Sequence, residues 1–193
     1  MRIISGQFRG RILVEPDFDK TRPITDRVKQ SLFDALQARF AEGVVLDCFA
    51  GSGSMGLECL SRGAARVIFI ERDRAALKAL RANIDALGVR EQSVVLPVDA
   101  YAAAGHTDLH ELALAFVDPP YAHAETGHLR HKLDALLRAL AARALAPDGL
   151  ISFRHPTRTS VDAAALGVSI AREFAYGDMA ITWLVPRATG PAS

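Results

Sequence analysis

Four acidic residues stand at the ends of four successive apolar segments, and this placement is the clearest chemical signal in the chain. They are Asp47, Glu71, Asp99 and Asp118. In an open parallel sheet, ligands bind just outside the carboxyl ends of the strands. A helix N-cap would account for any one of these acids. Four in succession predict that one edge of a sheet binds a polar ligand.

The first of these apolar segments leads into a loop of small residues, VVLDCFAGSGSMG over residues 44–56. Glycines at such a turn let backbone N–H groups approach a ligand, and the following helix N-terminus carries partial positive charge. Glu71 follows Gly51 by twenty residues, the spacing of an acid that accepts hydrogen bonds from ribose hydroxyls. Asp99 and Ala100 follow the third segment, where an acid could hold the exocyclic amine of an adenine. These features predict an adenosine-containing ligand, and nicotinamide dinucleotide and S-adenosylmethionine both qualify.

The segment DPPY, made of Asp118, Pro119, Pro120 and Tyr121, favours S-adenosylmethionine. Two successive prolines remove two N–H donors and hold the backbone extended. Carbonyl oxygens and one carboxylate are left as acceptors at a strand end, beside an aromatic ring. An exocyclic amine offers two N–H donors to such acceptors, and the ring can stack on its base. Because hydride transfer needs no such group, we expect these four residues to bind the target amine of a methyl transfer.

Apolar and amphipathic segments alternate along the chain in the pattern of an α/β protein. Short apolar runs predict strands, and apolar stripes at helical spacing predict helices. The expected strands of the central part are Val44–Cys48, Arg66–Ile70, 93–97, Leu112–Val117 and 150–153, and the expected helices are 25–40, 55–61, Arg74–Leu87, 101–104 and 127–143. Strands and helices that alternate in this way imply a parallel sheet covered on both faces.

Two hairpins flank this alternating region. Residues 2–5 and 11–15 predict a small N-terminal β-hairpin, which must dock on the main body. Residues 168–175 and 179–185 predict two strands separated by three residues, a connection so short that it requires antiparallel pairing. The expected organisation is a hairpin and connector over 1–24, a main domain over 25–186 and a disordered tail over 187–193.

The composition suits one domain with a full core, because half of the 193 residues are hydrophobic. No apolar run approaches the ~18 residues of a membrane span, and the N-terminus lacks the apolar core of an export signal. Cys48 and Cys59 are too few for a disulfide framework. These features predict a cytoplasmic protein. The net charge is +1, but residues 1–30 carry seven basic and four acidic residues, a local excess that suits phosphate contacts.

The segments DPPY at 118–121 and FAGSG at 49–53 are similar to motifs of the methyltransferases that act on exocyclic nitrogens of nucleic-acid bases. Further motifs are RIISG at 2–6, RGR at 9–11, TRP at 21–23, TDRV at 25–28, SLF at 31–33, GLE at 56–58, LSRGA at 60–64 and YGD at 176–178. With these, nearly the whole chain resembles the bacterial RsmD family, whose members methylate the N2 amine of one guanine in 16S ribosomal RNA. The resemblance implies a Rossmann-like class I methyltransferase fold, with a seven-stranded, mainly parallel sheet and an antiparallel terminal hairpin.

The resemblance also implies roles for individual residues. S-adenosylmethionine would be held by Asp47, Phe49, Ala50, Gly51, Ser52, Gly53, Glu71, Arg72, Asp99 and Ala100, and its methionine end would be covered by Thr21, Arg22, Pro23 and Thr25. RNA would be contacted by Arg9, Arg11, Arg27 and Lys29. The implied partner is 16S rRNA or the assembled small ribosomal subunit, bound by a monomer. No metal is expected, because His123, His128 and His131 match no standard zinc spacing.

A few positions depart from the family pattern. Lys29 and Gln30 replace an Arg-Glu pair, and Ile24 replaces a Thr. Arg154 and His155 stand after the fifth strand, where other members tend to carry Glu, and we expect His155 in a loop.

Three alternative functions remain beside the rRNA guanine methyltransferase. They are a methyltransferase for another base amine, such as adenine N6 in DNA or RNA, a nicotinamide-dependent oxidoreductase, and a non-catalytic RNA-binding module. The DPPY segment disfavours the oxidoreductase, and the length of the chain leaves little room for a DNA-recognition domain.

Overall fold

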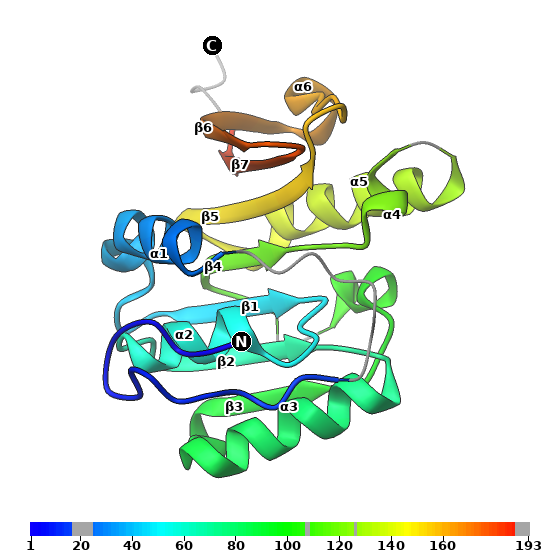
Figure 1. The fold of residues 1–193 in the computed structure, drawn as a ribbon. Coiled ribbons are helices and arrows are strands. Elements are labelled where there is room, and N and C mark those ends of the chain that lie inside the picture. The colour runs from blue at the N-terminus through cyan, green and yellow to red at the C-terminus, as the bar shows by residue number, and fades with distance from the viewer. Residues whose placement is uncertain (17–24, 107–108, 126, 188–193) are drawn as a thin grey trace.

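The computed structural model describes residues 1–16, 25–106, 109–125 and 127–187, and its helices and strands alternate through most of the chain (Figure 1). The strands are β1 (Val44–Cys48), β2 (Arg66–Ile70), β3 (Ser93–Leu96), β4 (Leu112–Val117), β5 (Leu145–Pro156), β6 (Val168–Tyr176) and β7 (Met179–Pro186). The helices are α1 (Asp26–Phe40), α2 (Ser54–Ser61), α3 (Arg74–Leu87), α4 (Tyr121–Glu125), α5 (His128–Ala139) and α6 (Ala163–Leu166), and shorter helical turns are η1 (Arg90–Gln92), η2 (Ala100–Gly105) and η3 (Leu140–Ala144).

The strands form one seven-stranded sheet in the order β3-β2-β1-β4-β5-β7-β6. Strands β1 to β5 are parallel, whereas β7 runs antiparallel to both of its neighbours, β5 and β6. The predicted mainly parallel sheet with an antiparallel terminal hairpin is therefore confirmed. The arrowheads of β1, β2 and β4 lie toward the right of Figure 1, so the loops that leave these strands meet at that edge.

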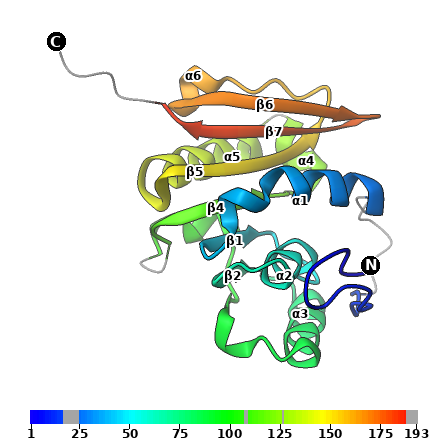
Figure 2. The same cartoon turned by 90° about the vertical axis from the view of Figure 1, so that its left-hand side faces the viewer.

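Each strand divides its side chains between two hydrophobic cores. Val45 of β1 and Val67 of β2 pack in the core shared with α1, α2 and α3, and their neighbours Leu46 and Ile68 pack in the core shared with η2, α5 and α6. This alternation follows from the period of two in a strand. Because apolar residues occupy both phases, the strands read as continuous apolar runs, as a parallel sheet covered on both faces requires (Figures 1 and 2).

The N-terminal segment folds back on itself without forming the two regular strands predicted over 2–5 and 11–15. One antiparallel bridge, from Arg2 to Ile12, joins its two limbs. Side chains of the main domain take the place of further strand pairing. The backbone N–H donors are Ile4 and Ser5, which bond to Glu58 of α2 at 2.8 and 2.9 Å, and Val14, which bonds to Asn83 of α3 at 2.7 Å. The hairpin is therefore tied to these two helices, beside which it lies in Figure 2.

The strand expected over 150–153 is longer than predicted and begins at Leu145. Leu145 pairs with Leu112 of β4, but Leu150 pairs with Leu114, so four residues of β5 bulge opposite one residue of β4. Helix α5 ends at Ala139, before the predicted end at residue 143, and continues as the wider turn η3. Helix α4 was absent from the prediction. The expected connector at 17–24 and residues 188–193 of the expected tail lie outside the described residues.

Among the helices that the structure describes, none is both long and apolar enough to cross a membrane.

Candidate active site

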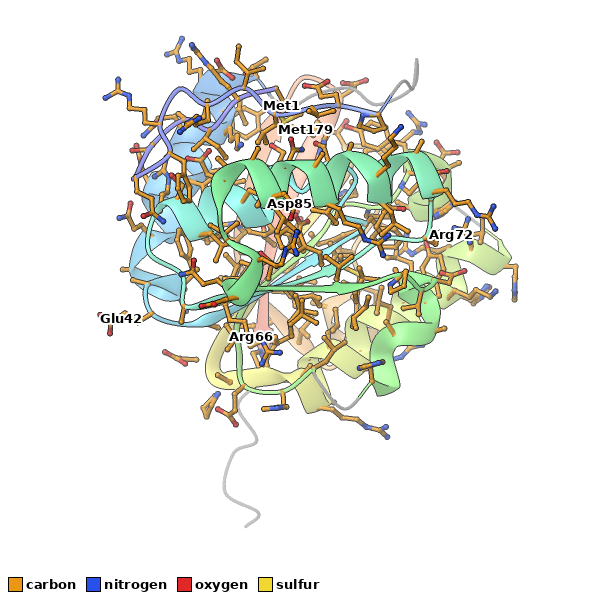
Figure 3. The ribbon with its side chains drawn as sticks, turned by 90° about the horizontal axis from the view of Figure 1, so that it is seen from below. Met1, Glu42, Arg66, Arg72, Asp85 and Met179 are labelled. Carbon is orange, nitrogen blue, oxygen red and sulfur yellow. The ribbon has the colours of Figure 1, made fainter. Side chains whose placement is uncertain are left out.

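The four acids predicted to share one edge of the sheet do so. Asp47 lies in β1, and the other three follow the carboxyl ends of β2, β3 and β4. The strand order places them along the edge as Asp99, Glu71, Asp47 and Asp118. Figure 3 shows Arg72, the neighbour of Glu71, on the side of the molecule opposite Glu42, which precedes β1. The four acids therefore lie in a row along one edge of the sheet, where the predicted cofactor and amine residues that follow β1 to β4 also lie.

The glycine-rich loop after β1 has the backbone geometry of a ligand cradle. Gly51 and Gly53 have φ angles of 57° and 81°, in the left-handed region that favours glycine. A Cβ on Gly53 would lie 2.4 Å from Leu80 of α3, whereas a Cβ on Gly51 would meet no atom within 4 Å. Gly53 is thus needed for packing, and the space above Gly51 is open to a ligand. Phe49 also has a positive φ, 67°, a conformation that costs a non-glycine residue roughly 1–2 kcal/mol.

Asp47 ties the end of this loop, where α2 begins, to strand β1. The residue is 2% exposed, and its carboxylate accepts a hydrogen bond of 2.8 Å from the N–H of Gly56 in the first turn of α2. Burial raises the pKa of Asp47 to about 7, and the nearby carboxylates of Asp118 and Glu71 add to this rise. A positively charged ligand at this edge would lower the pKa again, because it favours the ionised form.

Glu71 joins the loops that follow β1 and β2. Its carboxylate accepts backbone hydrogen bonds from Gly51 at 2.9 Å and from Arg72 and Asp73 at 2.8 Å each. An ionised carboxylate has about four acceptor positions, so these three donors leave one for a ribose hydroxyl. The same side chain can therefore shape the cradle and bind the ligand.

Asp99 and Arg72 form an ion pair of 2.8 Å at the β3 end of the site. Asp99 also caps η2 by accepting the N–H of Tyr101 at 3.0 Å. The hydroxyl of Tyr101 lies 2.8 Å from Nδ1 of His123 in α4, and its ring contacts the ring of Phe49 with centroids 5.5 Å apart. Burial, followed by the charge of Asp99, raises the pKa of Tyr101 to about 12, so the hydroxyl keeps its proton at neutral pH.

The DPPY segment leaves β4 and turns directly into α4. The carbonyl of Pro120 accepts the N–H of His123 at 2.8 Å and so belongs to the first turn of the helix. No donor among the described residues reaches the carbonyl of Pro119, which remains an acceptor beside Asp118. Burial raises the pKa of Asp118, and the neighbouring guanidinium of Arg154 opposes that rise.

The prediction that Lys29 contacts RNA is wrong, because its side chain is fully buried. Its ammonium lies 3.1 Å from Glu58 and donates to the carbonyl and hydroxyl oxygens of Ser54 at 3.0 and 2.9 Å. Burial lowers the pKa of Lys29, and the charge of Glu58 offsets part of this effect. Arg62 pairs with the other oxygen of Glu58 at 2.9 Å. Lys29 therefore belongs to a buried charge cluster beneath the N-terminal hairpin.

The remaining predicted residues divide between the site and its surroundings. Ala50 and Ser52 lie in the loop after β1, Ala100 is the first residue of η2, and all three are buried. Thr25 caps α1, where its hydroxyl accepts the N–H of Val28 at 3.4 Å. The arginines predicted to contact RNA, Arg9, Arg11 and Arg27, are exposed. Thr21, Arg22 and Pro23 lie outside the described residues.

Sequence reasoning missed the structural roles of Glu58, Tyr101, His123 and Arg154. Arg154 had a usable signal, since it directly follows the predicted strand 150–153, at the edge of the sheet where the four acids lie. Glu58 also had one, as an acid in the middle of an apolar helix. His155 is not in a loop, contrary to the prediction: it is buried in β5, with Nε2 2.8 Å from the hydroxyl of Thr182. Within the described residues, no cluster of three or more His, Cys, Asp or Glu side chains could hold a metal ion.

The chain resembles known proteins along nearly its whole length. Residues 1–185 match the model of a family described as conserved hypothetical protein 95. YlbH of Bacillus subtilis (strain 168), which is named as an rRNA methyltransferase, is 34% identical over 180 residues, covering 92% of this chain and 94% of that protein. Ribosomal RNA small subunit methyltransferase D of Escherichia coli (strain K12) is 44% identical over 121 residues, which span 63% of this chain and 60% of that enzyme.

The fold comparison agrees with the sequence comparison. A solved structure from Escherichia coli, described as the methyltransferase yhhF, superposes with a TM-score of 0.81 and 34% identity, covering 97% of this chain and 98% of that one. A methylase structure from Haemophilus influenzae, HI0767, gives a TM-score of 0.75 over 96% of this chain and 98% of that one, at 27% identity. The chain therefore belongs to the conserved hypothetical protein 95 family, the RsmD family that its sequence motifs predicted.

Proposed function

We propose that this protein transfers a methyl group from S-adenosylmethionine to the exocyclic N2 amine of a guanine in 16S ribosomal RNA. The main supporting observation is a pair of acceptors at the end of β4, the Asp118 carboxylate and the Pro119 carbonyl, on the edge that also bears the glycine-rich cradle. Arg154 bonds to one oxygen of the carboxylate, and no donor among the described residues reaches the other oxygen or the Pro119 carbonyl. The E. coli relative named small subunit methyltransferase D supports 16S rRNA as the substrate.

The cofactor half of the site fits S-adenosylmethionine in both shape and chemistry. The space above Gly51 is open, and Glu71 retains an acceptor position for a ribose hydroxyl. Asp99 would accept the adenine amine, and Phe49 and Arg72 border the same end of the site. Thr21, Arg22, Pro23 and Thr25 are proposed to cover the methionine end. When bound, S-adenosylmethionine supplies an electrophilic methyl group on a positively charged sulfur.

The amine half of the site acts on the nucleophile. A base amine is a weak nucleophile because its lone pair is delocalised into the ring. Asp118 and the carbonyl of Pro119 would each accept one N–H, which draws the nitrogen toward tetrahedral geometry and localises the lone pair. The nitrogen must lie about 3–3.5 Å from the methyl carbon, in line with the bond that breaks. The nitrogen becomes positively charged as the new bond forms, and the carboxylate of Asp118 stabilises that charge until a proton leaves.

The proposed contact with RNA rests on exposed cations at the N-terminal hairpin and α1. Arg9, Arg11 and Arg27 are free of the buried cluster and available to phosphates. A base paired inside a helix cannot present its amine to the site, so the guanine must be flipped or unpaired. We propose that the protein acts as a monomer, because the glycine-rich cradle and the DPPY segment follow neighbouring strands, β1 and β4, of one sheet. We also propose that it acts in the cytoplasm, where 16S rRNA is assembled into subunits.

A labelled-methyl assay with three substrates tests this proposal. The protein is incubated with labelled S-adenosylmethionine and small subunits, naked 16S rRNA or double-stranded DNA, the two RNA substrates being isolated from cells that lack the corresponding methyltransferase. Label in either RNA sample supports the proposal. Label in DNA alone would reject it and favour a DNA base methyltransferase that uses the same amine site.

A further inference from the structure

Arg154 reaches the proposed amine site from the neighbouring strand. The parallel register pairs Val117 of β4 with Phe153 of β5, so the residues that follow, Asp118 and Arg154, lie side by side. Nη1 of Arg154 donates to Oδ2 of Asp118 at 2.7 Å. The Arg154 side chain is only 15% exposed, compared with 33% for Asp118, so the bond is shielded from water on the arginine side. It is a charge-assisted bond of the strong class.

The guanidinium of Arg154 also contacts Met179 and Tyr121 among the described residues. Its Nε donates to Sδ of Met179 at 2.8 Å, at the start of β7. Its central carbon lies 5.7 Å from the centroid of the Tyr121 ring. Arg154 therefore contacts both ends of the DPPY segment, the carboxylate that opens it and the aromatic ring that closes it.

In the part of the chain that the structure describes, the charged or titratable groups around the Asp118 carboxylate are Asp47, Arg154 and Tyr121. Asp47 of β1 lies close enough that the charge of Asp118 raises the pKa of Asp47. Arg154 of β5 attracts it, and Tyr121 of α4 lies beside the guanidinium. Burial thus favours a protonated Asp118, and the charge and hydrogen bond of Arg154 favour the ionised form.

We propose that Arg154 is a positioning residue of the methyl-transfer reaction, which keeps Asp118 ionised and fixed by Oδ2 so that Oδ1 accepts the target amine. This inference rests on the function proposed above. Among the described residues, no donor reaches Oδ1, so the arginine bond leaves one carboxylate oxygen for the substrate. Because the guanidinium is anchored on β7 and beside Tyr121, it would also hold the carboxylate and the ring in a constant relation to the base between them.

The test compares Arg154→Gln and Arg154→Lys with the control Arg90→Gln. Arg90 forms an Arg–Asp pair of the same length, 2.7 Å, with Asp85, but it lies in η1, before β3 and therefore at the opposite edge of the sheet. For each variant we would measure kcat and KM for small subunits or 16S rRNA from pH 5 to pH 9, together with the Kd for S-adenosylmethionine. A charge-assisted bond of this class predicts a fall in kcat of about 10- to 100-fold for Arg154→Gln at neutral pH.

The shape of the pH profile separates positioning from a merely structural role. For Arg154→Gln we expect the acid limb of kcat to move to higher pH, the Kd for S-adenosylmethionine to stay within about twofold of wild type, and Arg154→Lys to restore part of the acid limb. Arg90→Gln should match wild type. An active Arg154→Gln variant whose pH profile superposes on the wild-type profile would overturn the inference.

A second readout does not depend on activity. With ¹³C-labelled aspartate, NMR titration reports the pKa of Asp118 directly, and the loss of its signal in Asp118→Asn assigns it. We expect a higher pKa in Arg154→Gln than in wild type, and an unchanged pKa overturns the inference. If the wild-type protein methylates no RNA, the proposed function fails, and the titration still decides the relation between Arg154 and Asp118.

Discussion

Lys29 and Glu58 form an ion pair of 3.1 Å in which neither side chain is exposed to solvent. Glu58 also pairs with Arg62 and accepts two N–H groups of the N-terminal hairpin. Removing one partner of a buried pair costs about 3–5 kcal/mol, because the other charge is left uncompensated. We therefore expect Glu58→Gln to lower the free energy of unfolding by roughly this amount, as measured by urea denaturation.

An exposed ion pair provides the control for this prediction. Asp85 and Arg90 lie 2.7 Å apart, with side chains that are 51% and 79% exposed. Pairs of this kind contribute about 0–1 kcal/mol, so Asp85→Asn should leave the urea midpoint almost unchanged. Equal effects of the two substitutions would show that the buried cluster does not hold the hairpin on the domain.

The raised pKa of Asp47 predicts how the free energy of unfolding depends on pH. Its pKa is about 7 in the folded protein, above the ordinary value of 3.8, so the folded state binds a proton that the unfolded state has lost. Its contribution to stability is therefore full in acid and is lost as the pH rises from about 4 through 7. Asp47→Asn keeps an acceptor for the N–H of Gly56 and removes the charge. We expect the Tm of this variant, relative to wild type, to rise progressively between pH 4 and pH 8, and a constant difference across that range would disprove the assignment.

Gly51 and Gly53 lie in the same loop but should respond differently to alanine. At Gly53 the new Cβ would lie 2.4 Å from Leu80 on a backbone with φ of 81°, so Gly53→Ala should destabilise the fold by about 1–3 kcal/mol. At Gly51 the Cβ meets no protein atom and enters the proposed ligand space. Gly51→Ala should therefore cost about 1 kcal/mol of stability, through its positive φ, but weaken S-adenosylmethionine binding more than tenfold. Calorimetric binding and thermal unfolding check both values, and unchanged binding by Gly51→Ala would remove this loop from the cofactor site.

Arg9 and Arg11 are exposed on the N-terminal hairpin and should contribute to RNA affinity through phosphate contacts. Each neutral substitution, Arg9→Gln or Arg11→Gln, should reduce the slope of log affinity against log salt by roughly one. Lys78→Gln, an exposed cation of α3, serves as the control. The measurement is filter binding to 16S rRNA between 50 and 200 mM salt, on the order of the range over which such contacts weaken. A slope equal to that of wild type in both arginine variants would place the RNA surface elsewhere.

The central fold could be predicted closely because its signals are local. The strands Val44–Cys48, Arg66–Ile70 and Leu112–Val117 and the helix Arg74–Leu87 have the predicted bounds. Each of these strands is an apolar run buried on both faces, and the helix has a cap at each end, at Asp73 and Gly88. The N-terminal segment could not be predicted well, because the acceptors that replace strand pairing are supplied by Glu58 and Asn83, more than fifty residues away.

The site could be predicted as a set of strand ends but not as a set of contacts. The edge that carries Asp47 and Asp118 follows from the rule for parallel sheets. The bond between Asp118 and Arg154 depends on the register of β4 against β5, which no local pattern reveals. The burial of Lys29 likewise depends on the side chain of Glu58 that meets it on another helix. From sequence alone, charged residues near an N-terminus are predicted to be exposed unless their ion-pair partners are known.

The identity of the methylated nucleoside tests the central claim most directly. Small subunits from cells that lack the corresponding methyltransferase are incubated with the protein and S-adenosylmethionine, and the 16S rRNA is digested and analysed by mass spectrometry. We predict one N2-methylguanosine per 16S rRNA molecule with the wild-type protein and at least about a 100-fold lower rate with Asp118→Ala, which should still bind S-adenosylmethionine. N6-methyladenosine in place of N2-methylguanosine, or wild-type rates in Asp118→Ala, would contradict the account.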